Sequence, residues 1–144
     1  MTTPFIVNYP RASINEQTVC CDWQDVTSRI LIRIHDFWDG SEYSLLDTHA
    51  GKYFHIVYNF HFNDTDNDDK GITKEQAVHI AAILEESLKH GRDVFVHCTA
   101  GICRSGAVVE CGVVLGFKDT GKRRQPNVRV KTMILKEMGF YAYE

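Results

Sequence analysis

The residues best suited to chemistry lie in one short segment, VFVHCTAGICRSG, which spans residues 94–106. Cys98 and Arg104 stand six positions apart in it, with Gly101 between them. An apolar run precedes Cys98 and another begins near Arg104, a pattern typical of a buried strand, a short loop and the start of a helix. Such a loop directs backbone N–H groups and the positive end of a helix dipole toward one point. That arrangement binds an anion, and a phosphate suits it well.

The same positive field would act on the thiol of Cys98. A helix amino terminus and a nearby cation favour the thiolate, which is the nucleophilic form of cysteine. Arg104 offers a planar fork of donors that matches two phosphate oxygens, whereas a lysine supplies charge without that geometry. The segment therefore predicts a cysteine nucleophile that attacks an anion held by loop amides and a guanidinium. This interpretation requires a sulfur that a tetrahedral anion can reach and a guanidinium turned toward that anion.

The segment resembles the active-site signature of the protein tyrosine phosphatase superfamily, His-Cys-x5-Arg-Ser/Thr. Here the signature begins at His97-Cys98 and ends at Arg104-Ser105, with Gly101 at the family's glycine position. The small chain, with no recognisable phosphotyrosine-recognition segment upstream, looks more like the dual-specificity branch. The resemblance implies a phosphatase that forms a phosphocysteine intermediate and hydrolyses phosphotyrosine in proteins, with phosphoserine and phosphothreonine as further candidates. It implies no metal and no cofactor, and a phosphorylated protein as the partner, with phosphate or sulfate able to occupy the loop.

The resemblance also implies roles for individual residues. Cys98 would attack phosphorus while Arg104 and the loop amides bind the phosphate oxygens. Ser105 would assist as the sulfur leaves, and His97 would order the loop. Cys103 is either a small packing residue or a resolving thiol that forms a reversible disulfide with Cys98. The predicted phosphate-binding residues are Thr99, Ala100, Gly101, Ile102, Cys103, Arg104 and Ser105.

The family's mechanism also needs a general acid, because the leaving oxygen is a poor leaving group until it is protonated. By resemblance this acid is an aspartate on a loop before the cysteine, and the acidic segment at residues 63–69 is in that place. Asp64 follows a predicted strand end and lies 34 residues before Cys98, whereas Asp66 lies 32 residues before it. We favour Asp64 and keep Asp66 as the alternative.

Regular elements before the segment must hold it in place. Val26 to Ile34 and Tyr53 to Phe62 are rich in β-branched and aromatic residues and are predicted as strands. A helix is predicted from a capping box that begins at Thr73 to a stop at Gly91. The short apolar run from Asp93 to Val96 is typical of a buried, parallel strand.

The elements after the segment complete a single predicted domain over residues 1–144. Ser105 to Phe117 is nearly all apolar and predicts a helix in the middle of the domain. Lys118 to Arg124 is interpreted as a basic, solvated turn, and Asn127 as the N-cap of a last helix that ends at Gly139. The order of strands and helices predicts an α/β fold with a central, mostly parallel sheet flanked by helices.

Composition narrows the class of protein. The chain has 144 residues, 44% of them hydrophobic, and a net charge of -3, which suits one globular domain and argues against a nucleic-acid-binding partner. No apolar run approaches the roughly 20 residues that span a bilayer. The five cysteines form no CxxC pair, which together with the absence of an export signal predicts free thiols and a cytoplasmic location.

Two other classes of function remain open from the sequence. Rhodanese-like sulfur transferases also place a cysteine at the start of an anion-binding loop, although their loop usually lacks the His-Cys-x5-Arg-Ser string. A non-catalytic phosphate-binding module usually follows the loss of the cysteine, the arginine or the acid. This sequence retains candidates for all three residues, which favours the enzyme.

Overall fold

A computed structural model describes the chain except for residues 1–2, 11–28, 38–53, 68 and 141–144. Its described strands form one five-stranded sheet in the order β3-β2-β4-β1-β5, and every pairing in it is parallel. This is the α/β architecture that the sequence predicts. The strands are β1 (Phe5–Pro10), β2 (Arg29–His35), β3 (Ile56–His61), β4 (Asp93–Cys98) and β5 (Lys118–Asp119).

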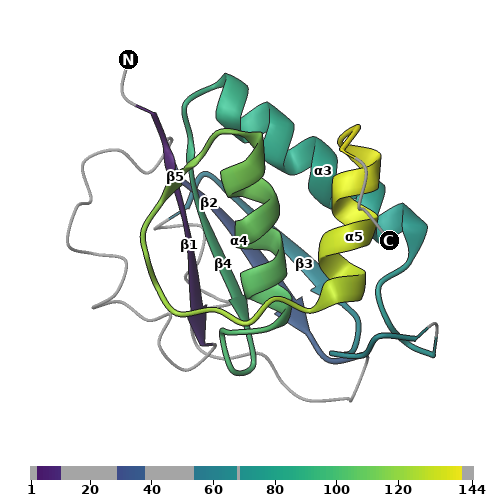
Figure 1. The fold of residues 1–144 in the computed structure, drawn as a ribbon. Coiled ribbons are helices and arrows are strands. Elements are labelled where there is room, and N and C mark those ends of the chain that lie inside the picture. Colours follow the sequence, from purple (N-terminus) through teal and green to yellow (C-terminus); the bar gives the residue numbers. More distant parts are fainter. Residues whose placement is uncertain (1–2, 11–28, 38–53, 68, 141–144) are drawn as a thin grey trace.

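Two of the three described helices, α3 and α5, begin at the caps predicted from the sequence. α3 (Lys74–Lys89) begins after Thr73, whose side chain and Gln76 form the predicted capping box. α4 (Arg104–Leu115) follows the loop after β4, and α5 (Val128–Glu137) is capped by Asn127. Figure 1 shows all three helices on the same face of the sheet, with α4 over its centre.

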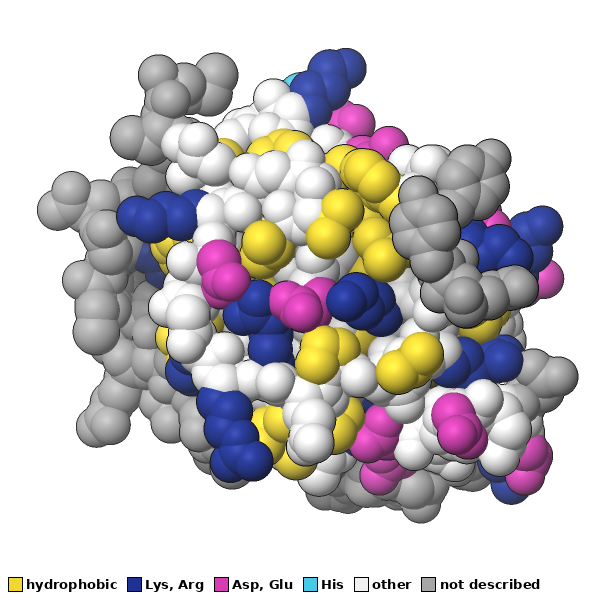
Figure 2. Space-filling model, viewed as in Figure 1, with side chains coloured by type: hydrophobic (Ala, Val, Ile, Leu, Met, Phe, Trp, Pro, Cys, Tyr) yellow, Lys and Arg dark blue, Asp and Glu magenta, His cyan; other side chains and the backbone are white. Residues whose placement is uncertain are grey.

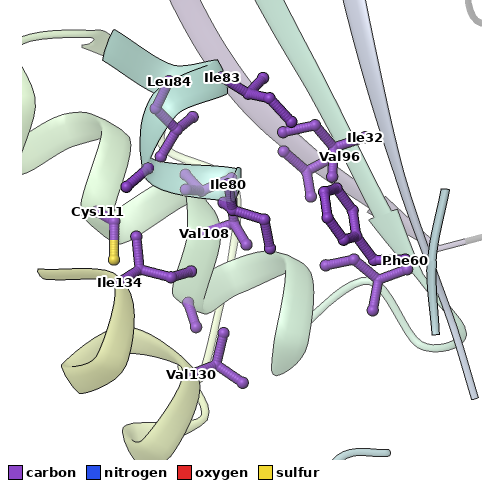
Figure 3. Packing of buried hydrophobic residues seen from close by; sticks show 14 of the residues in the cluster. Ile32, Phe60, Ile80, Ile83, Leu84, Val96, Val108, Cys111, Val130 and Ile134 are labelled. Carbon is purple, nitrogen blue, oxygen red and sulfur yellow. The ribbon is translucent and has the colours of Figure 1, made fainter. Parts of the chain in front are cut away.

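The core between sheet and helices is built from aliphatic side chains and a few phenylalanines. Ile32, Phe60 and Val96 project from the sheet toward the helices, where α3, α4 and α5 supply the matching side chains (Figure 3). A smaller cluster of Val7, Leu31, Phe54 and Phe95 covers the other face. The central strands are therefore buried on both sides, which explains their nearly continuous apolar sequence.

The middle helix packs unusually close to the sheet. A Cβ on Gly112 would lie 2.6 Å from the Ile6 Cδ1 atom, so glycine lets α4 approach β1 without displacing the Ile6 side chain. Because β1 pairs with β4 and aligns Pro10 with Cys98, the same contact fixes the end of β4 relative to the start of α4. The sheet and α4 thus position the loop between them.

Two strands were not predicted from the sequence. β1 lies in the first third of the chain, and β5 occupies the first residues of the predicted basic turn at Lys118 to Arg124. The apolar helix begins at Arg104 and ends at Leu115, instead of running from Ser105 to Phe117. Residues 26–28 of the first predicted strand and Tyr53 of the second lie outside the described residues.

The helix face of the surface carries side chains of every kind. Lys, Arg, Asp and Glu side chains are interspersed with apolar ones on this face (Figure 2). In the described part of the chain, no helix combines the length and the apolar character needed to cross a bilayer.

Candidate active site

The predicted loop runs from the end of β4 to the first turn of α4, and its hydrogen-bond donors converge on the sulfur of Cys98. The N–H groups of Gly101 and Ser105 point at Sγ from 3.2 and 3.4 Å. The Ser105 hydroxyl oxygen lies 3.1 Å from the same sulfur. Three donors of the loop thus converge on this one sulfur.

Further loop amides have no acceptor of their own. Within the described residues, the N–H groups of Ala100, Ile102 and Cys103 donate to no backbone oxygen. Unpaired amides at the amino end of a helix are suited to bind an anion. The rim of the loop at Thr99 and Ala100 is exposed, so such an anion can approach from solvent.

The position of the sulfur differs from what the sequence analysis required. Cys98 is only 2% exposed, so its sulfur lies beneath the loop instead of on an open surface. The cause is the close approach of Gly101 and Ser105, whose N–H groups turn inward to the sulfur. A phosphate can therefore contact this sulfur only when the loop amides also turn toward the phosphate oxygens.

Gly101 is required by both the conformation and the packing of the loop. Its φ of +73° lies in the left-handed region, and a Cβ there would fall 2.1 Å from the Pro10 backbone nitrogen. The Asn8 side chain holds this contact, since its Nδ2 donates to the Gly101 carbonyl over 2.7 Å and to the Arg123 carbonyl over 3.1 Å. β1, which the sequence analysis did not predict, thus supports the loop directly.

The guanidinium of Arg104 is buried and mostly held by the protein. Its Nη1 donates to the Asp36 carboxylate and to the Phe62 carbonyl, both over 2.8 Å, and its Nη2 donates to Thr99 Oγ1 over 3.2 Å. Arginine has five N–H donors, so these bonds leave the Nε donor and one Nη2 donor. Nε is buried and has no hydrogen-bond partner in the described structure.

Nε and Nη2 share one edge of the guanidinium, and each of them retains an N–H donor. A buried, charged N–H without an acceptor is costly, and native structures rarely keep one without a function. One edge with two parallel donors is the geometry that binds two oxygens of a phosphate or carboxylate. Arg104 therefore presents an unfilled anion-binding edge beside the loop of Cys98.

Asp64 lies next to the loop, at its Cys103 side. Its carboxylate accepts a hydrogen bond from Asn127 Nδ2 over 2.7 Å, and the backbone N–H of Asn127 donates to the Cys103 carbonyl over 3.0 Å. Asp66 is also exposed, and the described residues offer it no comparable contact with the loop. The structure thus brings one of the two predicted acid candidates to the loop.

The thiols of the domain differ in their surroundings. Burial raises the pKa of Cys103, and the nearby carboxylate of Asp64 raises it further. Burial in the core raises the pKa of Cys111 to about 12, so this residue packs as an inert side chain. Both are free cysteines, as is Cys98, and Cys20 and Cys21 lie outside the described residues.

His97 lies on the other side of β4 from the sulfur. Successive residues of a strand face opposite sides of the sheet, so its ring cannot take a proton directly from Cys98. Instead its Nε2 accepts a hydrogen bond from Arg33 Nε over 2.8 Å. Its ring also meets the edge of the His35 ring beneath the ends of the strands.

The basic turn is part of the support of the loop, not only a solvated turn. Arg124 forms ion pairs with Glu110 and Asp119, and the chain after it packs against the loop. The backbone N–H of Gln125 donates to the Ile102 carbonyl, and the backbone N–H of Asn127 donates to the Cys103 carbonyl, both over 3.0 Å. The predicted solvated character therefore does not hold for Arg124, whose side chain is mostly buried.

Two polar residues that contact the predicted site were missed by the sequence analysis. Asp36 follows directly after β2, and ligand sites of parallel sheets lie beyond the carboxyl ends of the strands. The position of Asp36 after a strand end could therefore have marked it as a site residue, and β2 does lie beside β4 in the sheet. Asn8 carried no comparable signal, since β1 itself was not recognised.

The fold is similar to that of a solved phosphatase structure. Tk-PTP in its active form superposes with a TM-score of 0.52 at 16% sequence identity, over 96% of this chain and 92% of that chain. No protein-family model matches the sequence, and no curated protein has a significantly similar sequence. The chain therefore has a parallel five-stranded sheet flanked by helices, an architecture similar to that of a protein tyrosine phosphatase.

Proposed function

We propose that this protein is a cysteine-dependent phosphatase of the dual-specificity type, which hydrolyses phosphotyrosine, and also phosphoserine or phosphothreonine, in protein substrates. The observation that carries the proposal is the free edge of Arg104, whose buried Nε lacks a partner next to a loop of unpaired amides. Cys98 lies at the base of the same loop, where the N–H of Gly101 donates to its sulfur, and Arg104 Nη2 contacts the loop at Thr99. The similarity of the fold to Tk-PTP is consistent with this proposal.

In the proposed first step, the Cys98 thiolate attacks phosphorus and the bond from phosphorus to the ester oxygen breaks. Arg104 and the loop amides stabilise the charge on the other phosphate oxygens. Asp64 gives its proton to the departing oxygen, so that an alcohol or phenol leaves. The products of this step are the free hydroxyl compound, a phosphocysteine and an ionised Asp64.

In the second step, water attacks the phosphocysteine. The ionised Asp64 takes a proton from this water, the phosphorus–sulfur bond breaks, and phosphate is released. The Ser105 hydroxyl, 3.1 Å from the sulfur, donates a hydrogen bond to the thiolate as it forms. The Cys98 thiolate and the protonated Asp64 are then restored for the next cycle, and no metal or cofactor takes part.

Access to the sulfur is the demanding part of this proposal. Since Cys98 is buried, phosphate must replace the sulfur as the acceptor of the Gly101 N–H while the sulfur moves toward phosphorus. Titration with vanadate or phosphate, followed by the amide NMR signals of residues 99–105, should show shifts centred on this loop.

The test is hydrolysis of para-nitrophenyl phosphate and of a phosphotyrosine peptide. Cys98→Ser should abolish both, by a factor of 10³ or more as a rough estimate for loss of a nucleophile. Cys111→Ser is the matched control, because it replaces a buried cysteine of the core and should retain activity. Hydrolysis that survives Cys98→Ser would overturn the proposal.

The acid is identified by a second pair of variants. Asp64→Asn should remove the basic limb of the pH–rate profile, because only the protonated acid assists the leaving oxygen. Asp66→Asn is its matched control and should keep that limb. The opposite result would transfer the role to Asp66.

A further inference from the structure

We propose that Asn127 is a positioning residue for Asp64, and that it holds the acid at a fixed place beside the loop of Cys98. This inference rests on the proposed function, in which Asp64 donates the proton. Asn127 makes contacts with three parts of the chain: the acidic segment, the loop and α5. No neighbouring residue joins these parts in this way within the described structure.

The orientation of the Asn127 amide follows from its partners. Its Oδ1 accepts the N–H of Val130 over 3.0 Å, as an N-cap of α5 must. The amide group therefore has to point its Nδ2 the other way. There Nδ2 donates to Asp64 Oδ1 over 2.7 Å and to the Thr65 carbonyl over 3.2 Å, so both of its donors are used.

The backbone of Asn127 fixes the other side of this bridge. Its N–H donates to the Cys103 carbonyl over 3.0 Å, directly before the first residue of α4. Asn127 thus connects Asp64 to the loop, although Asp64 lies on an exposed segment that is distant from the loop in the sequence.

This bridge determines which carboxyl oxygen can carry the reactive proton. Nδ2 occupies Oδ1, so the proton for the leaving group has to sit on Oδ2. A neutral amide can donate to the carbonyl oxygen of a protonated acid and also to a carboxylate. Asn127 can therefore keep its bond in both steps of the proposed cycle, whereas a lysine or arginine there would favour only the ionised state.

Asn127→Ser is the informative variant, because serine can still cap α5 but is too short to reach Asp64. For a substrate whose leaving oxygen needs a proton, such as phenyl phosphate, kcat should fall about 10- to 100-fold. For 2,4-dinitrophenyl phosphate, whose leaving group departs without a proton, kcat should change less than about threefold. KM should stay similar for both substrates, since the phosphate contacts are intact.

A double-mutant cycle distinguishes positioning from a general loss of stability. In the Asp64→Asn background, Asn127→Ser should have no further effect on phenyl phosphate hydrolysis, because the acid is already absent. Thr73→Ala is the matched control, since it removes the N-cap of α3 without touching the site. Equal losses on both substrates, or an undiminished loss in the Asp64→Asn background, would overturn the inference.

A measurement without substrate separates this inference from the proposed function. Asn127→Ser should accelerate amide hydrogen exchange of residues 63–67 several-fold, while Thr73→Ala should leave that segment unchanged. Unchanged exchange in Asn127→Ser refutes the bridge, whatever the activity. Absence of hydrolysis that depends on Cys98 refutes the proposed function instead, and with it the role of Asn127 toward an acid.

Discussion

Arg104 and Asp36 form an ion pair across the carboxyl edge of the sheet, with Nη1 2.8 Å from Oδ1. The arginine side chain is 5% exposed and that of the aspartate is 47% exposed, so solvent screens the carboxylate more than the guanidinium. The pair occupies the far side of the guanidinium from Nε. Its effect is therefore to orient the free edge of Arg104, and only weakly to neutralise its charge.

Replacement of Asp36 should separate these two effects. Asp36→Ala removes the acceptor of Nη1, and we expect kcat/KM for a phosphotyrosine peptide to fall about 10- to 100-fold, because a small displacement of an oriented group is costly. Asp36→Asn keeps an oxygen acceptor without the charge and should retain most of the activity. Equal losses in both variants would instead indicate that the negative charge itself is needed.

Ser105 should act mainly on the second chemical step. Its Oγ lies 3.1 Å from the Cys98 sulfur, where a donor stabilises a departing thiolate. We expect Ser105→Ala to slow hydrolysis of the phosphocysteine about tenfold, the effect of one hydrogen bond to a charged group. Rapid-quench measurements should then show a burst of product before a slower steady state.

The control for this variant is Ser87→Ala, which removes another buried serine from a helix far from the site. It should show neither a burst nor a lower steady-state rate. A Ser105→Ala enzyme that loses its first and second steps equally would indicate that the hydroxyl organises the ground state of the loop.

The sequence was sufficient to predict the loop, because its chemistry is local. Cys98, Gly101 and Arg104 act through a strand, a turn and a helix that are consecutive in the chain, and each has a recognisable pattern. The caps at Thr73 and Asn127 were predicted for the same reason, since a cap bonds to residues within one helical turn.

The partners of these residues could not be predicted, because they depend on the order of strands. Arg104 and Asp36 are 68 positions apart in the chain, and Asn127 and Asp64 are 63 positions apart. Parallel strands can be ordered in several ways for one sequence of elements. Only the placement of β2 beside β4 brings Asp36 to the loop.

Arg124 provides a prediction for stability as a function of pH. Hydrogen bonds from Arg124 lower the pKa of Asp119 from 3.8 to about 2. Because the folded pKa lies below the unfolded one, this pair stabilises the fold above about pH 4, and the stabilisation disappears as the pH falls through about 2. Asp119 is solvent-exposed, so the contribution should be about 1 kcal/mol or less.

Urea unfolding of Arg124→Gln tests this predicted dependence of stability on pH. The variant should unfold at a lower urea concentration than the wild type at pH 7, and the difference should narrow as the pH falls from 4 toward 2. Arg92→Gln is the control, because the Arg92 side chain has no ion pair within the described residues. A difference that is independent of pH would show that Arg124 stabilises the fold by packing against Gly106 rather than by charge.

Gly101 and Gly121 allow the strain of a left-handed residue to be separated from close packing at the site. Both have positive φ, +73° and +78°, so an alanine at either place is strained to a similar degree. At Gly121 nothing lies within 4 Å of the added Cβ, and the cost should be about 1 kcal/mol. At Gly101 the Cβ would meet the backbone of Tyr9 and Pro10, which cannot move without distorting β1.

Gly101→Ala should therefore lower the melting temperature more than Gly121→Ala and reduce kcat at least 100-fold, as expected when loop amides are displaced by about 1 Å. Gly121→Ala should keep wild-type kcat. Differential scanning fluorimetry and para-nitrophenyl phosphate hydrolysis measure both quantities on the same samples. If the two variants behaved alike, conformational strain alone would account for Gly101, and the support of the loop by β1 would have no part in the activity.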